Sequence, residues 1–134
     1  MKWKSALPAA ACLFSAIVIA TSMATIQAAS KLDLAKQGRE IFDKRCSGCH
    51  SMDLAKAAPA LRGVFGRRVG ADPRYPSSDA LKNAKFVWDE IKLDRWLADP
   101  ERVVPDNDMP FRLESPAERA AVIEFLKQNA SGRQ

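Results

Sequence analysis

The sequence predicts a small all-α domain with long ordered loops, and three observations support that fold class. Apolar residues recur at helical spacing in residues 32–45, in residues 88–98 and in the segment after Ser115. Prolines and glycines punctuate residues 51–81, where little periodicity is visible. No alternation of apolar and polar residues is long enough to predict a strand.

The first 29 residues have the features of a secretory signal peptide. A short basic start, residues 1–4, precedes an apolar stretch over about residues 6–24, and small residues follow. The apolar stretch contains Pro8 and several Ser and Thr residues, so it is a poor permanent membrane span. We expect cleavage after Ala28 or Ala29 and export to the periplasm; an uncleaved membrane anchor is the alternative.

The remaining segment, residues 30–134, is expected to form one small domain. The first 29 residues carry two of the 21 Lys and Arg residues and none of the 16 Asp and Glu residues, so the net charge falls from +5 to +3 on cleavage. Charges of both signs are interspersed, which argues against a nucleic-acid partner. We expect a monomer with no stable membrane insertion.

The first helix is expected over residues 32–45. Leu34, Ile41 and Phe42 lie on one face of this helix, and Gly38 lies on the same face. Because a glycine lowers the stability of a helix, we expect that another element approaches closely at Gly38.

A second helix is expected over residues 88–98, ended by the Asp-Pro pair at Pro100. The last helix has clear N-terminal signals: Ser115 as N-cap, Pro116 at the first helical position and Glu118 completing a capping box. Its buried stripe is expected to comprise Val122, Ile123, Phe125 and Leu126.

The most informative motif is Cys-Ser-Gly-Cys-His at residues 46–50, because C-x-x-C-H attaches a c-type haem. Cys46 and Cys49 can each add to one vinyl group, and His50 is then carried to the iron. A structural zinc usually needs four Cys or His ligands, and residues 30–134 contain only two Cys and one His. A thiol-exchange pair belongs beside a βαβ pattern, which is missing. We expect one covalently attached haem, around which the loops of residues 51–81 wrap.

The axial ligands follow by elimination. His50 is the only histidine of the chain, and Met52 and Met109 are the only methionines after the expected signal peptide. Met52 lies two residues beyond His50, so its short tether keeps it on the same side of the iron. Met109 lies in a loop between Pro105 and Pro110, whose fixed backbone suits a weak thioether ligand. We therefore predict His50 and Met109 as the iron ligands.

These residues together resemble a class I cytochrome c of the mitochondrial cytochrome c and bacterial cytochrome c2 type, over about residues 32–128. Residues 58–70, Ala-Pro-Ala-Leu-Arg-Gly-Val-Phe-Gly-Arg-Arg-Val-Gly, are similar to the proline-to-glycine loop of that family. The resemblance implies N- and C-terminal helices packed crosswise, with Gly38, Phe42 and Phe125 at their contact.

The resemblance also implies contacts around the haem. The carbonyl of Pro59 would accept a hydrogen bond from the second ring nitrogen of His50, which fixes the ring. Arg67, Tyr75 and Trp88 occupy positions that surround a haem propionate in the family, where charge-assisted donors stabilise a buried carboxylate.

The sequence departs from the family pattern at several positions. Trp96 replaces a tyrosine that often lies near the methionine sulfur, and Leu81 replaces an asparagine near the propionate. The methionine loop carries Glu101, Asp106 and Asp108 where the family is usually rich in lysine. The expected basic docking surface is therefore thinner than in the family.

The predicted function is transfer of single electrons between redox proteins in the periplasm. Its expected partners are a dehydrogenase, a membrane cytochrome complex or an oxidase, each bound transiently. With His50 committed to the iron, no histidine remains as a general base, so the protein is not expected to be an enzyme. The alternatives are a peroxidase or gas sensor with a displaceable sixth ligand, and a thiol-exchange protein that uses free Cys46 and Cys49.

Overall fold

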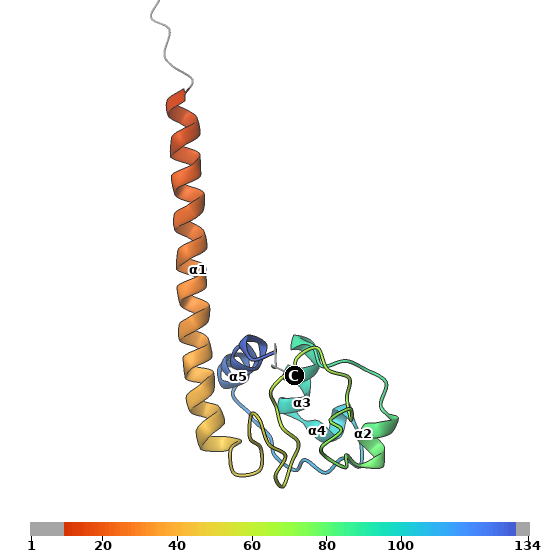
Figure 1. Cartoon of the computed structure of the whole chain (residues 1–134). Coiled ribbons are helices and arrows are strands. Elements are labelled where there is room, and N and C mark those ends of the chain that lie inside the picture. Colours follow the sequence, from red (N-terminus) through yellow and green to blue (C-terminus); the bar gives the residue numbers. More distant parts are fainter. Residues whose placement is uncertain (1–9, 131–134) are drawn as a thin grey trace, which may run out of the picture. The chain divides into compact units, whose positions relative to one another are not determined.

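The structure is a computed structural model that describes residues 10–130, with side chains described for residues 27–130. Within this range the helices are α1 (Ala10–Arg45), α2 (Asp79–Asn83), α3 (Glu90–Ala98), α4 (Pro100–Val103) and α5 (Pro116–Gln128) (Figure 1). No strand is present among the described residues, where one isolated bridge pairs Arg68 with Val87. The all-α fold class is confirmed.

The chain divides into two compact units, residues 1–32 and residues 33–134, and α1 contributes to both. The first unit includes the whole of the expected signal peptide, whose basic start at residues 1–4 lies outside the described residues. Across the described part of the chain, no helix is long and apolar enough to cross a membrane. The second unit contains the helices and loops that form the site.

α1 begins earlier than the sequence predicts. Residues 32–45 are helical as expected, but α1 starts at Ala10 and continues to Arg45. Residues 10–31 contain no glycine or proline and are rich in alanine, so nothing in this segment interrupts a helix. The expected N-terminal boundary was therefore wrong.

The buried face of the C-terminal half of α1 packs against α5. Ala35, Gly38 and Phe42 form this face. A Cβ atom on Gly38 would lie 1.9 Å from the carbonyl oxygen of Ala121 and 2.9 Å from the Cβ of Phe125. The rings of Phe42 and Phe125 have centroids 5.6 Å apart and planes inclined by 49°. The close approach expected at Gly38 is thus confirmed.

α3 completes the core by packing against both α4 and α5. Its buried side chains are Leu93, Trp96 and Leu97. The buried side chains of α5 are Ala121, Val122, Ile123, Phe125 and Leu126, which include the whole predicted stripe. An ion pair of 2.9 Å between Lys127 Nζ and Glu90 Oε2 joins the two helices at the surface.

α5 has the predicted N-cap Ser115 and the predicted Pro116 at its first position, whereas α3 begins later than predicted. Ser115 caps α5 by accepting a hydrogen bond of 3.3 Å from the backbone N–H of Glu118. α3 begins at Glu90, two residues later than expected, because Asp89 is its N-cap. The preceding Trp88 lies outside the helix, and its N–H donates to the carbonyl of Arg67 at 2.9 Å. α2 and α4, with five and four residues, are too short to show helical periodicity and were not predicted.

The long loop between α1 and α2 is ordered by hydrogen bonds to distant backbone. The N–H of Arg62 donates to the carbonyl of Met52 at 2.8 Å, and that of Gly63 donates to Asn129 at 2.9 Å, just after α5. Gly66 donates to the carbonyl of Trp88 at 2.8 Å. The loop therefore follows a defined path between the helices, although it contains no regular structure.

Substitution of Gly38 tests the contact between α1 and α5. Alanine would favour the helix by about 1 kcal/mol, but its methyl group would overlap the Ala121 carbonyl. We expect Gly38→Ala to lower the free energy of unfolding by about 1–3 kcal/mol, measured by guanidinium denaturation of the haem-loaded protein. Gln37→Ala, at an exposed neighbouring position, is the control. An unchanged or increased stability of Gly38→Ala would contradict the contact.

Candidate functional site

An apolar cavity of about 280 Å³ lies between the long loop, α3, α5 and the methionine loop. Its walls include Leu61, Val64, Leu93, Leu97 and Leu126. All the site residues predicted from the sequence line this cavity, namely Cys46, Cys49, His50, Pro59, Arg67, Tyr75, Trp88 and Met109. The structure therefore brings together residues that span more than sixty positions of the chain.

The turn after α1 places the two cysteines at the edge of the cavity. The N–H of Cys46 donates to the carbonyl of Phe42 at 2.9 Å, and the N–H of His50 donates to that of Cys46 at 2.9 Å. Both thiols are free; Cys46 is half-buried and Cys49 is exposed. Burial raises the pKa of Cys46 to about 11, against the opposing charge of Arg45. Before haem attachment, Cys46 is therefore a neutral thiol at neutral pH.

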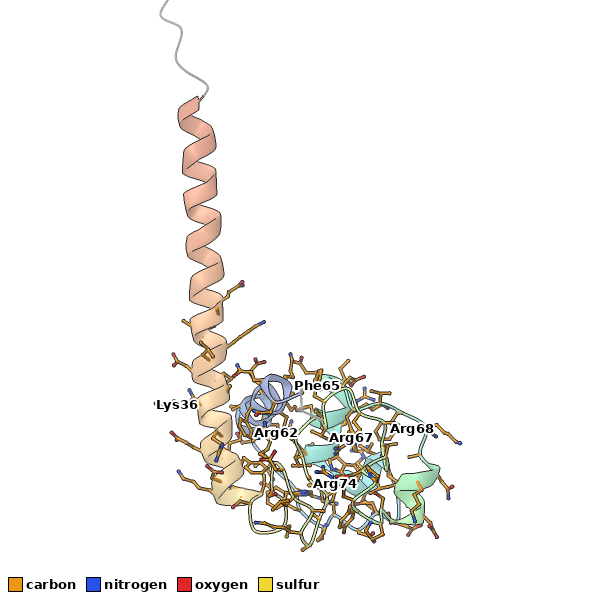
Figure 2. The ribbon with its side chains drawn as sticks, viewed as in Figure 1. Lys36, Arg62, Phe65, Arg67, Arg68 and Arg74 are labelled. Atoms are coloured by element: carbon orange, nitrogen blue, oxygen red, sulfur yellow. The ribbon has the colours of Figure 1, made fainter. Side chains whose placement is uncertain are left out.

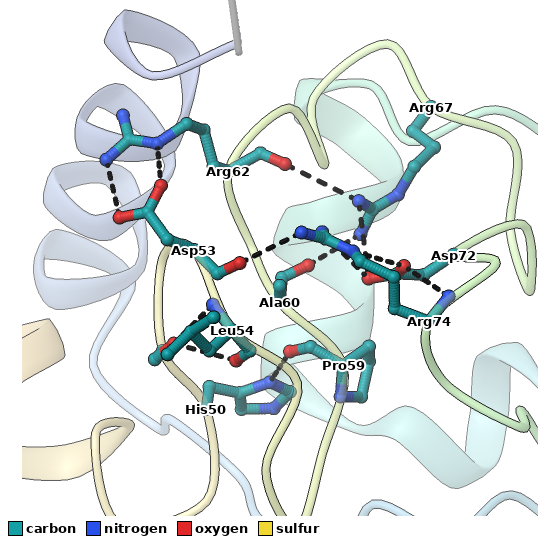
Figure 3. A network of polar contacts seen from close by, with 10 residues as sticks. His50, Asp53, Leu54, Pro59, Ala60, Arg62, Arg67, Asp72 and Arg74 are labelled. Atoms are coloured by element: carbon teal, nitrogen blue, oxygen red, sulfur yellow. Dashed lines mark hydrogen bonds and ion pairs between the residues drawn. The ribbon is translucent and has the colours of Figure 1, made fainter. Parts of the chain in front are cut away.

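The ring of His50 is fixed by the carbonyl of Pro59. His50 Nδ1 lies 2.8 Å from this oxygen (Figure 3). Because a carbonyl only accepts hydrogen bonds, Nδ1 carries the proton and Nε2 keeps its lone pair. Burial lowers the pKa of His50, while the bond to Pro59 opposes this shift. His50 is thus held as a neutral imidazole with a free Nε2, which is the form that binds a metal.

The sulfur of Met109 is held in the cavity by Trp96. Trp96 Nε1 donates a hydrogen bond of 3.0 Å to Met109 Sδ. The backbone N–H of Met109 donates to Asn107 Oδ1 at 2.8 Å. Met52 is buried in the core but does not line the cavity. Of these two methionines, only Met109 is placed to face a ligand bound there.

Arg67 and Tyr75 lie at the polar end of the cavity, and their side chains are bonded differently. Arg67 donates to the carbonyls of Ala60 at 2.9 Å and Arg62 at 3.4 Å. The hydroxyl of Tyr75 donates to the carbonyl of Ala57 at 3.0 Å. The Tyr75 hydroxyl is therefore engaged with backbone, while Arg67 lies against the cavity with its guanidinium fixed by two carbonyls.

The sequence reasoning missed two buried polar residues at this end, Asp72 and Ser77. Both line the cavity, at 6% and 5% relative exposure. Asp72 Oδ2 lies 3.9 Å from Arg67, and Arg74 Nε donates to Asp72 Oδ1 at 3.1 Å. Each residue adjoins a proline, Pro73 or Pro76, which indicates a turn but does not indicate burial.

A network of arginines joins the polar end to the rest of the loop (Figure 3). Arg74 Nη1 donates to the carbonyl of Asp53 at 2.9 Å, and the Asp53 carboxylate pairs with Arg62. Arg62 Nη1 also donates to Asn129 Oδ1 at 2.9 Å. Arg62, Arg67 and Arg74 therefore tie the turn after His50, the long loop and the end of α5 together (Figure 2).

Comparison with known proteins identifies the family. The sequence profile of the family described as cytochrome c matches residues 35–130, which is more than half of the chain. The chain belongs to the cytochrome c family. It is 39% identical over 97 residues to a cytochrome c of Sesamum indicum, covering 69% of this chain and 87% of that protein.

Bacterial members of the cytochrome c family are similar as well. A cytochrome c2 iso-2 of Magnetospirillum fulvum is 42% identical over 85 residues, covering 61% of this chain and 88% of that protein. Among solved structures, cytochrome cH from Methylobacterium extorquens superposes with a TM-score of 0.65 at 37% identity, covering 70% of this chain and 97% of that one. The small cytochrome c fold is therefore confirmed, and with it the resemblance seen in the sequence.

The cofactor of this family member is one covalently attached haem c. The site fits that group on chemical grounds: the walls are largely apolar, two thiols lie at the edge, and a neutral imidazole and a thioether line the same cavity. The partly buried Arg67 at the polar end suits a propionate. The protein is accordingly a monohaem electron carrier.

Asp72 predicts a pH dependence of stability. Burial by itself would raise the pKa of Asp72, but the hydrogen bonds and charge of Arg74, together with the charge of Arg67, bring the pKa below its ordinary value. Such a carboxyl contributes its full stabilisation when the pH lies above the pKa that it has in the unfolded chain. This contribution is lost as the pH falls through the lower pKa that it has in the folded protein. We expect Asp72→Asn to lower the free energy of unfolding by about 1.5 kcal/mol at pH 7.

The difference between Asp72→Asn and wild type should shrink as the pH falls below about 5. Guanidinium denaturation of the haem-loaded proteins at a series of pH values measures it. Asp79→Asn, whose side chain is 92% exposed, removes the same charge as a control. A constant difference across this pH range would show that Asp72 is not stabilised as a carboxylate.

Proposed function

We propose that this protein is a periplasmic electron carrier whose haem iron is ligated by His50 and Met109. The observation that supports it best is that one cavity is lined by both side chains, with His50 Nε2 left free by the Pro59 hydrogen bond. Met109 reaches the cavity with its sulfur oriented by Trp96. Thioether and imidazole together favour the ferrous state more than two imidazoles would.

Each site residue has a separate task in this proposal. The S–H groups of Cys46 and Cys49 add across the two vinyl groups, which forms two thioether bonds and consumes both thiols. Pro59 holds the ring of His50 in the tautomer that leaves Nε2 to the metal. Arg67, Tyr75 and Trp88 line the cavity, and Arg67 would supply the positive charge for a propionate.

The haem supplies a one-electron ferrous–ferric couple, and the residues of the chain keep its surroundings constant during transfer. The half-exposed edge at Cys46 and Cys49 gives partners access to the haem. Partners would be redox proteins such as a dehydrogenase, a membrane cytochrome complex or an oxidase, bound briefly through a small interface. A peroxidase or gas sensor would require Met109 to leave, which its bonds to Trp96 and Asn107 oppose.

Replacement of Met109 tests the sixth ligand. We expect Met109→Ala to abolish the weak red absorption band of iron–sulfur ligation in the oxidised protein and to lower the midpoint potential, because a donor that favours ferrous iron is lost. The affinity of the ferric protein for added imidazole should rise at least about tenfold, because no internal ligand competes. Absorption spectra and a redox titration measure these changes.

Met52→Leu is the matched control, since Met52 is buried away from the cavity. It should leave the band and the potential unaltered. If Met109→Ala instead behaved like wild type in all three measurements, Met109 would not be the ligand.

Export of the protein is tested by the mass of the haem-loaded product. If residues 1–29 are a signal peptide, the chain isolated from the periplasm should begin at Ala29 or Ser30 and carry one haem. Ala28→Leu combined with Ala29→Leu should retain the longer chain, because small residues are needed at the cleavage site. A wild-type product that still begins at Met1 would favour the uncleaved anchor.

A further inference from the structure

We infer that Glu101 is a positioning residue for the sixth iron ligand: through Asn107 it holds the loop that carries Met109 closed over the haem cavity. This inference rests on Met109 as the ligand, as proposed above. It assigns a task to an acidic side chain on α4 that does not line the cavity.

The Glu101 carboxylate binds two groups of the turn that precedes Met109. Its Oε1 accepts a hydrogen bond of 3.0 Å from the backbone N–H of Asp106. Its Oε2 accepts one of 3.1 Å from the side-chain Nδ2 of Asn107. One side chain thus uses both oxygens to fix two successive residues.

Asn107 carries this constraint to Met109. Its Nδ2 donates to the carbonyl of Val104 at 2.9 Å in addition to Glu101, and its Oδ1 accepts from the backbone N–H of Met109 at 2.8 Å. Every hydrogen-bonding atom of the Asn107 side chain therefore has a partner. The orientation of this amide sets the backbone position of Met109.

The turn needs such support because its backbone is strained. Asp106 adopts a φ of +59°, the only positive φ of a non-glycine residue in the described part of the chain. A residue with a Cβ atom is disfavoured in this left-handed region, although aspartate tolerates it better than most. The hydrogen bond from Asp106 N–H to Glu101 stabilises this conformation directly.

Glu101 itself starts from a fixed position. It lies on α4, which begins at the buried Pro100 and is followed by the buried Val104. The N–H of Val104 donates to the carbonyl of Pro100 at 3.0 Å. The Glu101 carboxylate therefore links the short helix α4 to the turn at Asp106 and Asn107. Trp96 orients the sulfur of Met109 from α3, while Glu101 and Asn107 hold its backbone.

These contacts should lower the affinity of the haem iron for added ligands such as imidazole. Added imidazole can bind the ferric iron only after the iron–sulfur bond breaks and Met109 moves away, and one bond then replaces the other without a change of oxidation state. Opening the loop requires the Glu101 and Asn107 contacts to break as well. Loss of these contacts should therefore raise the apparent affinity for imidazole.

The experiment titrates the oxidised, haem-loaded protein with imidazole and follows the loss of the red iron–sulfur band. We expect Glu101→Ala to bind imidazole about tenfold more tightly than wild type, equivalent to about 1.4 kcal/mol. Glu101→Gln keeps one acceptor and places an NH₂ group against the other donor, so its increase should be about threefold. Both variants should retain the band when no imidazole is present.

Two controls separate positioning from other effects. Glu114→Gln removes an equal charge from an exposed residue beyond the same loop and should leave the affinity unchanged. Ser115→Ala removes the N-cap of α5 and lowers overall stability, but it leaves the methionine loop intact. Its imidazole affinity should equal that of wild type even though its unfolding midpoint falls.

A double variant tests the relay through Asn107. If Glu101 acts through Asn107, then Glu101→Ala combined with Asn107→Ala should bind imidazole no more than about twofold more tightly than the stronger single variant. Fully additive effects would overturn the relay. An imidazole affinity of Glu101→Ala equal to that of wild type would overturn the positioning role. If wild type itself lacked the red band, the ligand assignment would fail instead, so the two failures are distinguishable.

Discussion

The hydrogen bond between His50 and the carbonyl of Pro59 is the interaction on which the site depends. It links the turn that carries the two cysteines to the loop that forms one wall of the cavity, and it selects the tautomer with a free Nε2. A rotated ring would place the proton on the nitrogen that we propose as the iron ligand. The contact of α1 with α5 at Gly38 supports this arrangement, because the turn of the motif follows directly from the end of α1.

The two proposed iron ligands are held by different means, and the difference follows from their chemistry. His50 is a strong donor on a short tether after Cys49, so one backbone hydrogen bond is enough to orient it. Met109 is a weak donor at the tip of a long loop, and both its sulfur and its backbone N–H are held by other side chains. The indole N–H of Trp96 can only donate a hydrogen bond. It therefore orients the sulfur of Met109 but offers the metal no competing ligand atom.

Local features of the sequence predicted residues that line one cavity, because these features are chemically specific. The C-x-x-C-H motif, the single histidine and the Ser115-Pro116 start of α5 each require only neighbouring residues to be interpreted. The start of α1 was missed because most of residues 10–31, which contain no glycine or proline, were assigned to the expected signal peptide. Asp72 and the contacts of Glu101 could not be predicted, since their partners are set by how the loops fold back rather than by spacing.

The charges at the polar end of the cavity are arranged to accept one further anion. Arg67 and Arg74 bring two positive charges, and Asp72 neutralises one of them. Arg74 is half-exposed and bonds Asp72 from outside, whereas Arg67 is mostly buried and fixed by carbonyls that carry no net charge. The unbalanced positive charge therefore lies on Arg67, on the cavity side, where burial makes an ionised carboxylate its most favourable partner. A haem propionate placed there would neutralise the second arginine charge, which Asp72 alone does not neutralise.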